Sequence, residues 1–184
     1  MQVAENGPDT IQKFFGIDIN PATNEEARRL LAEAGIADKT HLISGSITDP
    51  ESLKAVQREM TNGKQMRAVA SINFILHDIG PDLSRQFLKN HAQFFPNTPL
   101  IITETLRMPS EVLRAHPHYQ AASFQYMHKA SGQHLYDEAE LRALLKECGY
   151  IIEHEQVHSS MPSEKNDGSR LNTIVTYIGK PNGA

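Results

Sequence analysis

Cysteine is nearly absent from this sequence, because Cys148 is the only one among its 184 residues. A single cysteine cannot close an internal disulfide, which excludes a disulfide-stabilised secreted scaffold, and it cannot supply the thiolates of a zinc ribbon. Tryptophan is absent altogether. Long apolar runs are missing too: even the stretch 72–76 is interrupted by Asn73, whereas a membrane-spanning helix needs about 20 apolar residues. We therefore expect no membrane partner.

An excess of positive charge is also missing. The sequence has 18 Lys and Arg residues against 22 Asp and Glu residues, a formal net charge of −4, and its basic residues are scattered. Nucleic acid is therefore not expected as a partner. The opening residues 1–6 have neither the basic start nor the apolar centre of a signal peptide, which favours a cytoplasmic protein. The length suits a single domain over residues 1–184.

Short apolar stretches alternate with helical patterns along the chain. Residues 66–76 form a nearly continuous apolar run, which is typical of a strand buried on both faces. The patterns predict strands over residues 14–19, 41–47, 66–76, 99–106, 150–158 and 171–178, and helices over residues 25–34, 48–62, 81–95, 121–130 and 137–148. This alternation predicts an α/β fold with a mostly parallel sheet covered by helices, in which the last two strands form an antiparallel pair.

Polar residues at the carboxyl ends of the strands are the candidates for function, because ligands bind at that edge of a parallel sheet. Asp18 ends the first predicted strand and precedes a helix start. An acidic residue at this position binds ribose in dinucleotide-type folds, since one carboxylate accepts hydrogen bonds from both hydroxyls. A helix cap or a solvated side chain is the alternative interpretation of Asp18, and both stay open.

A second candidate is a histidine with a carboxylate behind it. His77 closes the third predicted strand, and Glu104 lies at the end of the next one. Imidazole accepts a proton near neutral pH, and a carboxylate fixes its tautomer and stabilises the imidazolium, so this pair suits general base catalysis. Position alone also allows the simpler role of His77 as a cap for the turn at residues 78–81.

One motif in the sequence matches a zinc signature literally. Residues 154–158 read His-Glu-Gln-Val-His, the H-E-x-x-H pattern of zinc enzymes. That chemistry needs a helix, on which both imidazoles reach one metal ion. Here the motif continues a predicted strand, where His154 and His158 would lie about 13 Å apart at roughly 3.3 Å per residue. We therefore predict no metal site.

Several stretches, in order along the chain, resemble the class I S-adenosylmethionine (SAM)-dependent methyltransferases, and most closely the catalytic domain of small-molecule O-methyltransferases. Residues 16–21 resemble the second cofactor motif, residues 71–78 resemble the family's Leu-His-Asp-Trp segment, and residues 100–104 resemble the strand whose final Glu supports that His. Residues 137–150 resemble the late passage from helix to strand. The resemblance implies a Rossmann-like sheet, SAM as cofactor and a small-molecule substrate.

The resemblance also implies roles for individual residues. His77 would take the proton from an acceptor hydroxyl, with Glu104 behind it. The implied cofactor residues are Asp18 and Ile19 in the ribose motif, Ser46 and Ile47 beside the adenine, and Asn73 along the methionine part. Three differences stand against this pattern: Ser46 replaces a frequent Asp, Ile79 replaces the Trp, and a second supporting acid is not found near residues 133–135.

The largest difference from the family lies at the front of the chain. The first strand and its glycine-rich loop should precede Asp18 by about twenty residues. Only residues 1–13 stand before the first predicted strand, and Gly7 and Asp9 do not form that motif. The missing strand is central in the family, so its absence leaves two inner strand edges unpaired. Either the chain is a fragment, or a partner chain or swapped copy in a homo-oligomer supplies the strand, or the two inner strands pair directly.

Two functions are compatible with these observations. The first is methyl transfer from SAM to a small-molecule acceptor, with a hydroxyl as the acceptor group and His77 as the base. The second is a methyltransferase-like protein or subunit without methyl transfer, which serves binding or assembly or catalyses a cofactor-independent rearrangement. The missing first strand and glycine-rich loop favour the second function, whereas Asp18, His77 and Glu104 favour the first.

Overall fold

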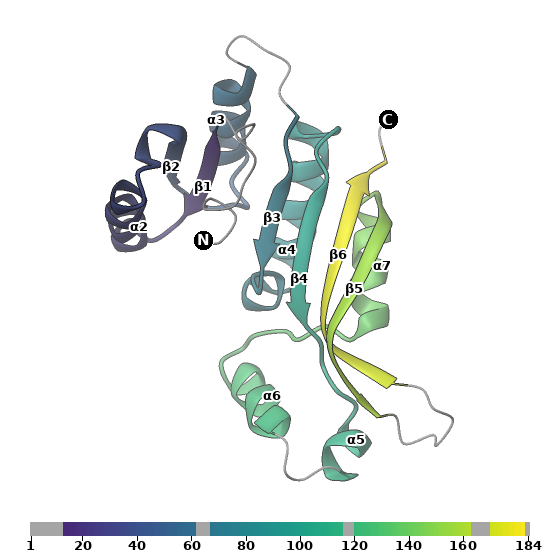
Figure 1. The fold of residues 1–184 in the computed structure, drawn as a ribbon. Coiled ribbons are helices and arrows are strands. Elements are labelled where there is room, and N and C mark those ends of the chain that lie inside the picture. The colour runs from purple at the N-terminus through teal and green to yellow at the C-terminus, as the bar shows by residue number, and fades with distance from the viewer. Residues whose placement is uncertain (1–12, 62–66, 116–119, 163–169, 183–184) are drawn as a thin grey trace. The chain divides into compact units, whose positions relative to one another are not determined.

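The computed structural model describes residues 13–61, 67–115, 120–162 and 170–182. Within the chain, two compact units are distinguished, an N-terminal unit (Met1–Met66) and a C-terminal unit (Arg67–Ala184), and each is described by itself (Figure 1). A single domain over residues 1–184 stays a prediction. No helix among the described residues is long and apolar enough to cross a membrane.

The N-terminal unit is built on two parallel strands. In chain order its elements are β1 (Phe14–Asp18), α2 (Pro21–Glu33), the 3₁₀ turn η1 (Ala37–Lys39), β2 (Thr40–Ser44) and α3 (Pro50–Thr61). Asn20 caps α2 by accepting the Ala22 N–H at 3.0 Å, and a proline occupies the first turn, as is common there. The register places Asp18 opposite Ser44, so both strands end at the same edge.

The C-terminal unit contains a four-stranded sheet with helices (Figure 1). Its strands have the order β3-β4-β6-β5; β3 and β4 are parallel, and β6 is antiparallel to both of its neighbours. The elements are β3 (Ala70–Asn73), α4 (Leu76–Phe94), β4 (Leu100–Thr105), α5 (Ser110–Ala115), α6 (Gln120–Ala130), α7 (Glu138–Glu147), β5 (Tyr150–Pro162) and β6 (Arg170–Pro181). The predicted α/β sheet with a C-terminal antiparallel strand is confirmed.

The region around His77 differs from its prediction. A strand was expected over residues 66–76, but β3 ends at Asn73 and α4 begins at Leu76. His77 therefore lies in the first turn of a helix and not at the end of a strand, so this expectation was wrong. The run is also not buried on both faces: Ile72 and Leu76 are buried, whereas Val69 and Phe74 are exposed.

Two backbone features explain the early helix start. Phe74 has a φ of 57°, in the left-handed region that non-glycine residues rarely adopt, and its N–H donates to the Thr103 carbonyl at 2.8 Å. The chain thus turns sharply while the strand pairing still holds it. Gly80 has φ 77° and ψ 173°, which kinks α4 just before Pro81. The predicted start at Pro81 is the start of the longer part of this kinked helix.

Other differences concern the length of elements. No strand or helix was predicted between residues 106 and 121, but α5 forms there, while residues 116–119 lie outside the described residues. The last two strands are longer than predicted and pair antiparallel, as expected. The residues before the first strand, with Gly7 and Asp9, also lie outside the described residues.

The described strands fall into two separate sheets. One sheet contains β1 and β2, and the other contains β3, β4, β6 and β5. The direct pairing of the two inner strands, one of the three arrangements considered for the missing strand, is therefore not found among the described residues. The other two arrangements, a fragment and a strand from another chain, stay predictions.

The core of the C-terminal unit packs helices α4 and α7 against the sheet. The inward side chains of β4 alternate, so Leu100 and Ile102 are fully buried and Glu104 takes the next inward position. On the helices, Leu88 and Leu141 are also fully buried. Burial of one such side chain contributes roughly 1.5–3 kcal/mol. This packing sets Glu104 in a rigid, apolar environment.

Candidate active site

A buried hydrogen bond joins His77 to Glu104 in the C-terminal unit. The Nδ1 atom of His77 lies 2.7 Å from Oε2 of Glu104, and the two residues are 5% and 1% exposed. A carboxylate oxygen only accepts, so Nδ1 donates the hydrogen and Nε2 is the nitrogen that exchanges protons. The structure thus brings together the two residues that were predicted to form the base and its support.

Glu104 also holds the start of the helix that carries His77. Its second oxygen, Oε1, accepts the Leu76 N–H at 2.8 Å. The first turn of a helix leaves backbone N–H groups without partners, and Ile75 before α4 has no polar side chain to cap them. A carboxylate from the neighbouring strand replaces the missing cap. The same group therefore fixes the imidazole and the backbone beneath it.

The surroundings of His77 favour its charged form. The hydrogen bond to Glu104 raises the pKa of His77, burial lowers it, and the charges of Glu104 and Asp78 raise it further. The net direction is upward from the ordinary value. The imidazole is therefore well suited to hold a proton, and its release depends on the groups around it.

Further side chains around His77 were not predicted as site residues. Its Nε2 lies 3.3 Å from Oδ1 of Asp78, and the side-chain amide of Gln133 donates to the same oxygen. The ring of His128 lies 5.1 Å from the His77 ring, centroid to centroid. The His134 N–H donates to the His77 carbonyl at 2.9 Å. In the sequence, no second supporting acid was found near Gln133 and His134. The side chain of Gln133 contacts Asp78, whereas His134 contacts His77 through its backbone N–H.

No local pattern in the sequence predicts these contacts. Asp78 directly follows His77, but only the helical start at Leu76 brings its carboxylate to the ring. Gln133 and His128 come from a different part of the chain, more than fifty residues later. Their approach depends on the tertiary packing of α6 and the segment after it.

The predicted ribose residue lies at the carboxyl edge of the N-terminal unit. Oδ1 of Asp18 accepts the Asn20 N–H at 2.7 Å, and the Asp18 carbonyl accepts the Gly45 N–H at 3.1 Å. The side-chain amide of Asn24 donates to the Asp18 carbonyl at 3.2 Å and to Ser44 Oγ at 3.0 Å. Asn24 is 2% exposed, so it braces the ends of both strands from inside. Its role was missed, because a polar residue in a helix gives no sequence signal of this kind.

The other predicted cofactor residues have different surroundings. Ile19 is 77% exposed, an unusual environment for a large apolar side chain. Ser46 Oγ lies 2.8 Å from Thr48 Oγ1 and accepts the Thr48 N–H at 3.2 Å, while Ile47 is half-buried. Asp18 thus ends β1, Ile19 follows it, and Ser46 and Ile47 follow the end of β2.

Asn73 belongs to the C-terminal unit, as do His77 and Glu104. It is exposed at the end of β3, and its side-chain amide donates to Ser71 Oγ at 3.2 Å. Two groups of candidate residues therefore exist, one in each unit.

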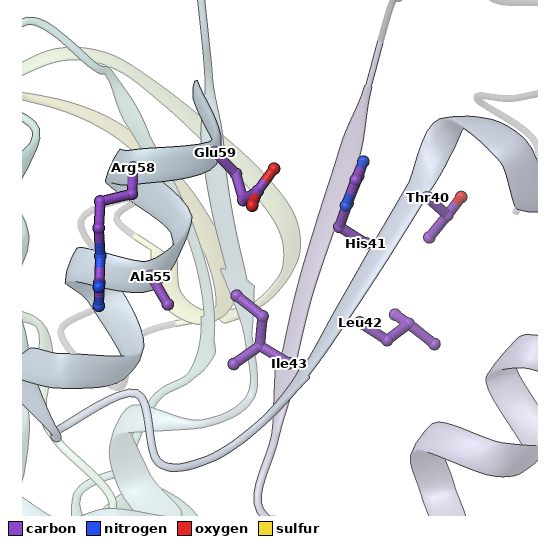
Figure 2. A pocket seen from close by; sticks show the side chains of 7 residues that line it. All are labelled: Thr40, His41, Leu42, Ile43, Ala55, Arg58 and Glu59. Atoms are coloured by element: carbon purple, nitrogen blue, oxygen red, sulfur yellow. The ribbon is translucent and has the colours of Figure 1, made fainter. Parts of the chain in front are cut away.

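A hollow of about 590 Å³ in the N-terminal unit holds none of the predicted site residues. Figure 2 shows its lining side chains, which come from β2 and α3: Thr40, His41, Leu42, Ile43, Ala55, Arg58 and Glu59. The four residues from β2 precede the carboxyl end of that strand, the edge where ligands of such sheets bind, and the other three belong to α3. We therefore locate the candidate site at the strand ends, where the polar side chains gather, and not in this hollow.

The H-E-x-x-H motif lies on β5, as predicted. His154 and His158 are exposed, and Nε2 of His158 lies 2.8 Å from Thr176 Oγ1. The helix that a zinc site of this type requires is thus a strand here. Among the described residues, no group of three or more His, Cys, Asp or Glu side chains is arranged to hold a metal ion.

Comparison with known proteins defines the fold. No family model and no curated protein matches the sequence. An O-methyltransferase family protein from Burkholderia thailandensis matches the structure with a TM-score of 0.58 and 15% identity, over 94% of this chain and 44% of its own. A SAM-dependent methyltransferase from Methanosarcina mazei has a TM-score of 0.58 and 17% identity, over 100% of this chain and 86% of its own.

A third solved structure, a geranyl diphosphate methyltransferase in complex with SAM, has a TM-score of 0.55 and 14% identity, over 91% of this chain and 68% of its own. The chain therefore has the fold of the class I SAM-dependent methyltransferases, as the sequence predicted. At these identities the likeness concerns the fold. The chain also spans less than half of the Burkholderia protein.

Proposed function

We propose that this chain transfers methyl groups from SAM to a small-molecule hydroxyl, with His77 as the general base and Glu104 as the residue that orients it. The observation that carries the proposal is the buried His77–Glu104 pair, at 2.7 Å, in a chain with a methyltransferase fold. A buried, oriented imidazole at such a site is well suited to take a proton from an acceptor oxygen.

The N-terminal unit offers side chains that fit the cofactor. Asp18 has one oxygen bonded to the loop backbone, and a carboxylate has further lone pairs that accept from ribose hydroxyls. The exposed Ile19 beside it offers an apolar surface to an adenine ring. Ser46 and Ile47 follow the neighbouring strand. In the C-terminal unit, Asn73 is the residue that the family resemblance assigns to the methionine part. SAM, when bound, supplies the methyl group from a sulfonium in a single displacement.

The residues of this chain would align the acceptor and move one proton. Nε2 of His77 would accept the hydroxyl proton as the acceptor oxygen takes the methyl group, so no covalent intermediate with the protein is needed. Glu104 would stabilise the resulting imidazolium through Nδ1. General base catalysis of this kind contributes roughly 10²–10⁴-fold in rate.

A second candidate function is a methyltransferase-like protein or subunit that binds or assembles without methyl transfer, or that catalyses cofactor-independent chemistry. The division of the described strands into two sheets favours it. Under either function we propose a cytoplasmic protein with a small-molecule partner, without nucleic-acid or membrane partners. If the strand that is missing from the family pattern comes from another chain, we propose that a homo-oligomer or a partner chain supplies it.

Calorimetric titration of the 184-residue chain with S-adenosylhomocysteine tests the proposal first. We expect binding with a micromolar dissociation constant. In a separate assay with tritiated SAM, we expect transfer of the labelled methyl group to a member of a panel of hydroxylated small molecules. Binding without transfer to any acceptor would favour the second function. Absence of both would contradict the proposed activity for this chain.

A further inference from the structure

The imidazole of His77 lies between two carboxylates, one at each ring nitrogen. Nδ1 lies 2.7 Å from Glu104 Oε2, and Nε2 lies 3.3 Å from Asp78 Oδ1. Nδ1 is hydrogen-bonded to Glu104, and a carboxylate beside Nε2 favours the ring that carries a hydrogen at both nitrogens. We propose that Asp78 is a positioning residue that holds His77 as an imidazolium in the free chain, so that Nε2 accepts a proton only after Asp78 moves aside.

The two carboxylates differ in how firmly they are held. The side chain of Glu104 is 1% exposed and is fixed by the Leu76 N–H, whereas that of Asp78 is 44% exposed. Within the described part of the chain, Nε2 of His77 and the amide of Gln133 contact its side chain, and both meet Oδ1. An exposed carboxylate is readily solvated when it leaves its partner. Asp78 is therefore the partner that can leave the ring, and Glu104 is the one that stays.

The other approaches to the ring are covered. His77 is 5% exposed, and the ring of His128 from α6 lies 5.1 Å from its ring. His128 is itself held by Nδ1, which donates to the Phe124 carbonyl at 2.8 Å. Among the described residues, the titratable groups that face His77 are thus Glu104 from β4, Asp78 from its own helix and His128 from α6. Of these, Asp78 is the one at Nε2, the nitrogen that would meet an acceptor.

The consequence for proton transfer follows directly and rests on the proposed function. An imidazolium has no lone pair at Nε2 and cannot act as a base. When an acceptor hydroxyl displaces the Asp78 carboxylate, the Nε2 proton leaves to solvent and the lone pair faces the hydroxyl. The acceptor proton then passes to Nε2 while its oxygen takes the methyl group. Asp78 would thereby keep the base inactive until the acceptor is in place.

The protonation state of His77 can be measured without any methyl transfer. Nitrogen-15 NMR of the full chain, with His77 assigned through a His77→Gln variant, reports whether both ring nitrogens carry hydrogen. In the unchanged chain we expect a titration midpoint above the ordinary histidine value, with the imidazolium pattern below that midpoint. In Asp78→Asn we expect the titration midpoint of His77 to fall by about one pH unit or more, because a neighbouring opposite charge is lost.

Two further variants complete the test. Asp82→Asn, an exposed aspartate later in the same helix, is the matched control and should leave the midpoint unchanged. Gln133→Ala removes the amide that holds Asp78 and should lower the titration midpoint of His77 by a smaller amount. This variant tests the proposal if Asp78→Asn does not fold. A midpoint at or below the ordinary histidine value in the unchanged chain, or the same midpoint in the Asp78 and Asp82 variants, would overturn the proposal.

An activity measurement separates this proposal from the proposed function. If methyl transfer occurs, the acidic limb of the pH profile of kcat/KM should move to lower pH in Asp78→Asn by the same amount as the NMR midpoint. An unmoved limb would overturn the catalytic consequence. If no methyl transfer occurs but the NMR midpoint falls, the contact with Asp78 stands and the proposed function fails.

Discussion

One carboxylate fixes both the ring of His77 and the backbone that carries it, because Glu104 contacts His77 Nδ1 at 2.7 Å and the Leu76 N–H at 2.8 Å. The pair is therefore a structural unit as well as a chemical one. Any change at Glu104 should alter the start of α4 and the charge of His77 together.

The variant Glu104→Gln tests this coupling. The amide keeps the size of the side chain but loses the charge, so the pKa of His77 should fall. Loss of a buried, charge-assisted bond should lower the free energy of unfolding by about 1–3 kcal/mol. Urea denaturation at pH 7 and NMR titration of His77 measure the two effects. A variant with unchanged stability and an unchanged midpoint would show that the pair is not coupled.

The catalytic role of His77 is tested by its removal. His77→Ala should reduce methyl transfer by about 10²-fold or more and leave the affinity for S-adenosylhomocysteine nearly intact, because the base acts on the acceptor proton. His158→Ala, an exposed histidine on β5, is the control and should keep full activity. Equal rates in both variants would exclude His77 as the base.

The cofactor role of Asp18 has its own signature. Asp18→Ala should weaken S-adenosylhomocysteine binding by about 1–3 kcal/mol, since ribose hydroxyls lose a charged acceptor. Asn24→Ala is a useful comparison, because Asn24 supports the Asp18 backbone but is itself buried, and it should lower stability before it lowers affinity. Calorimetry on both folded variants separates these effects. Unchanged affinity in Asp18→Ala would place the ribose elsewhere.

A second buried histidine predicts how stability depends on pH. Burial lowers the pKa of His91 to about 4, and its Nδ1 lies 2.7 Å from the Tyr150 hydroxyl. Between about pH 6.5 and pH 4 the unfolded chain therefore binds a proton at His91 that the folded chain does not bind. The free energy of unfolding falls over this range by about 3 kcal/mol in total. His77 acts in the opposite sense: its raised pKa stabilises the fold below about pH 6.5, and this contribution is lost as pH rises through the folded value.

The variant His91→Asn isolates the first effect. It keeps a donor toward Tyr150 but does not titrate in this range, so its unfolding free energy should change less between pH 7 and pH 4.5 than that of the unchanged chain. Urea denaturation at several pH values provides the measurement. His158→Asn, at an exposed position, should retain the original dependence, and an equally steep loss in His91→Asn would assign the acid sensitivity to other groups.

The general architecture followed from the sequence because the periodic patterns that specify it are local. The amphipathic residues of α7 and the alternating residues of β4 carry their own signal, and both elements lie close to the expected positions. The strand-to-helix order then fixed the fold class, which the solved structures confirm. Family resemblance added the pairing of His77 with Glu104, which the residues alone left open.

The environment of the site was less accessible to prediction. The early start of α4 depends on the left-handed Phe74 and on a cap from Glu104, which is 28 residues away in the chain. The burial of His91 and Asn24 depends on partners in other elements. Such long-range polar contacts leave no periodic trace in the sequence, so the residues that tune His77 became visible only in the folded chain.

The backbone amides of β3 distinguish the edge that pairs with β4 from the opposite edge. The Ala70 N–H donates to the Pro99 carbonyl at 2.9 Å, and the Phe74 N–H donates to the Thr103 carbonyl at 2.8 Å. Because amides alternate in direction along a strand, those of Ser71 and Asn73 point away from β4. In hydrogen–deuterium exchange, Ala70 and Phe74 therefore report on the sheet itself, whereas Ser71 and Asn73 report on whatever covers its edge. Slow exchange at these two amides would reveal a strand bound alongside β3, whichever chain supplies it.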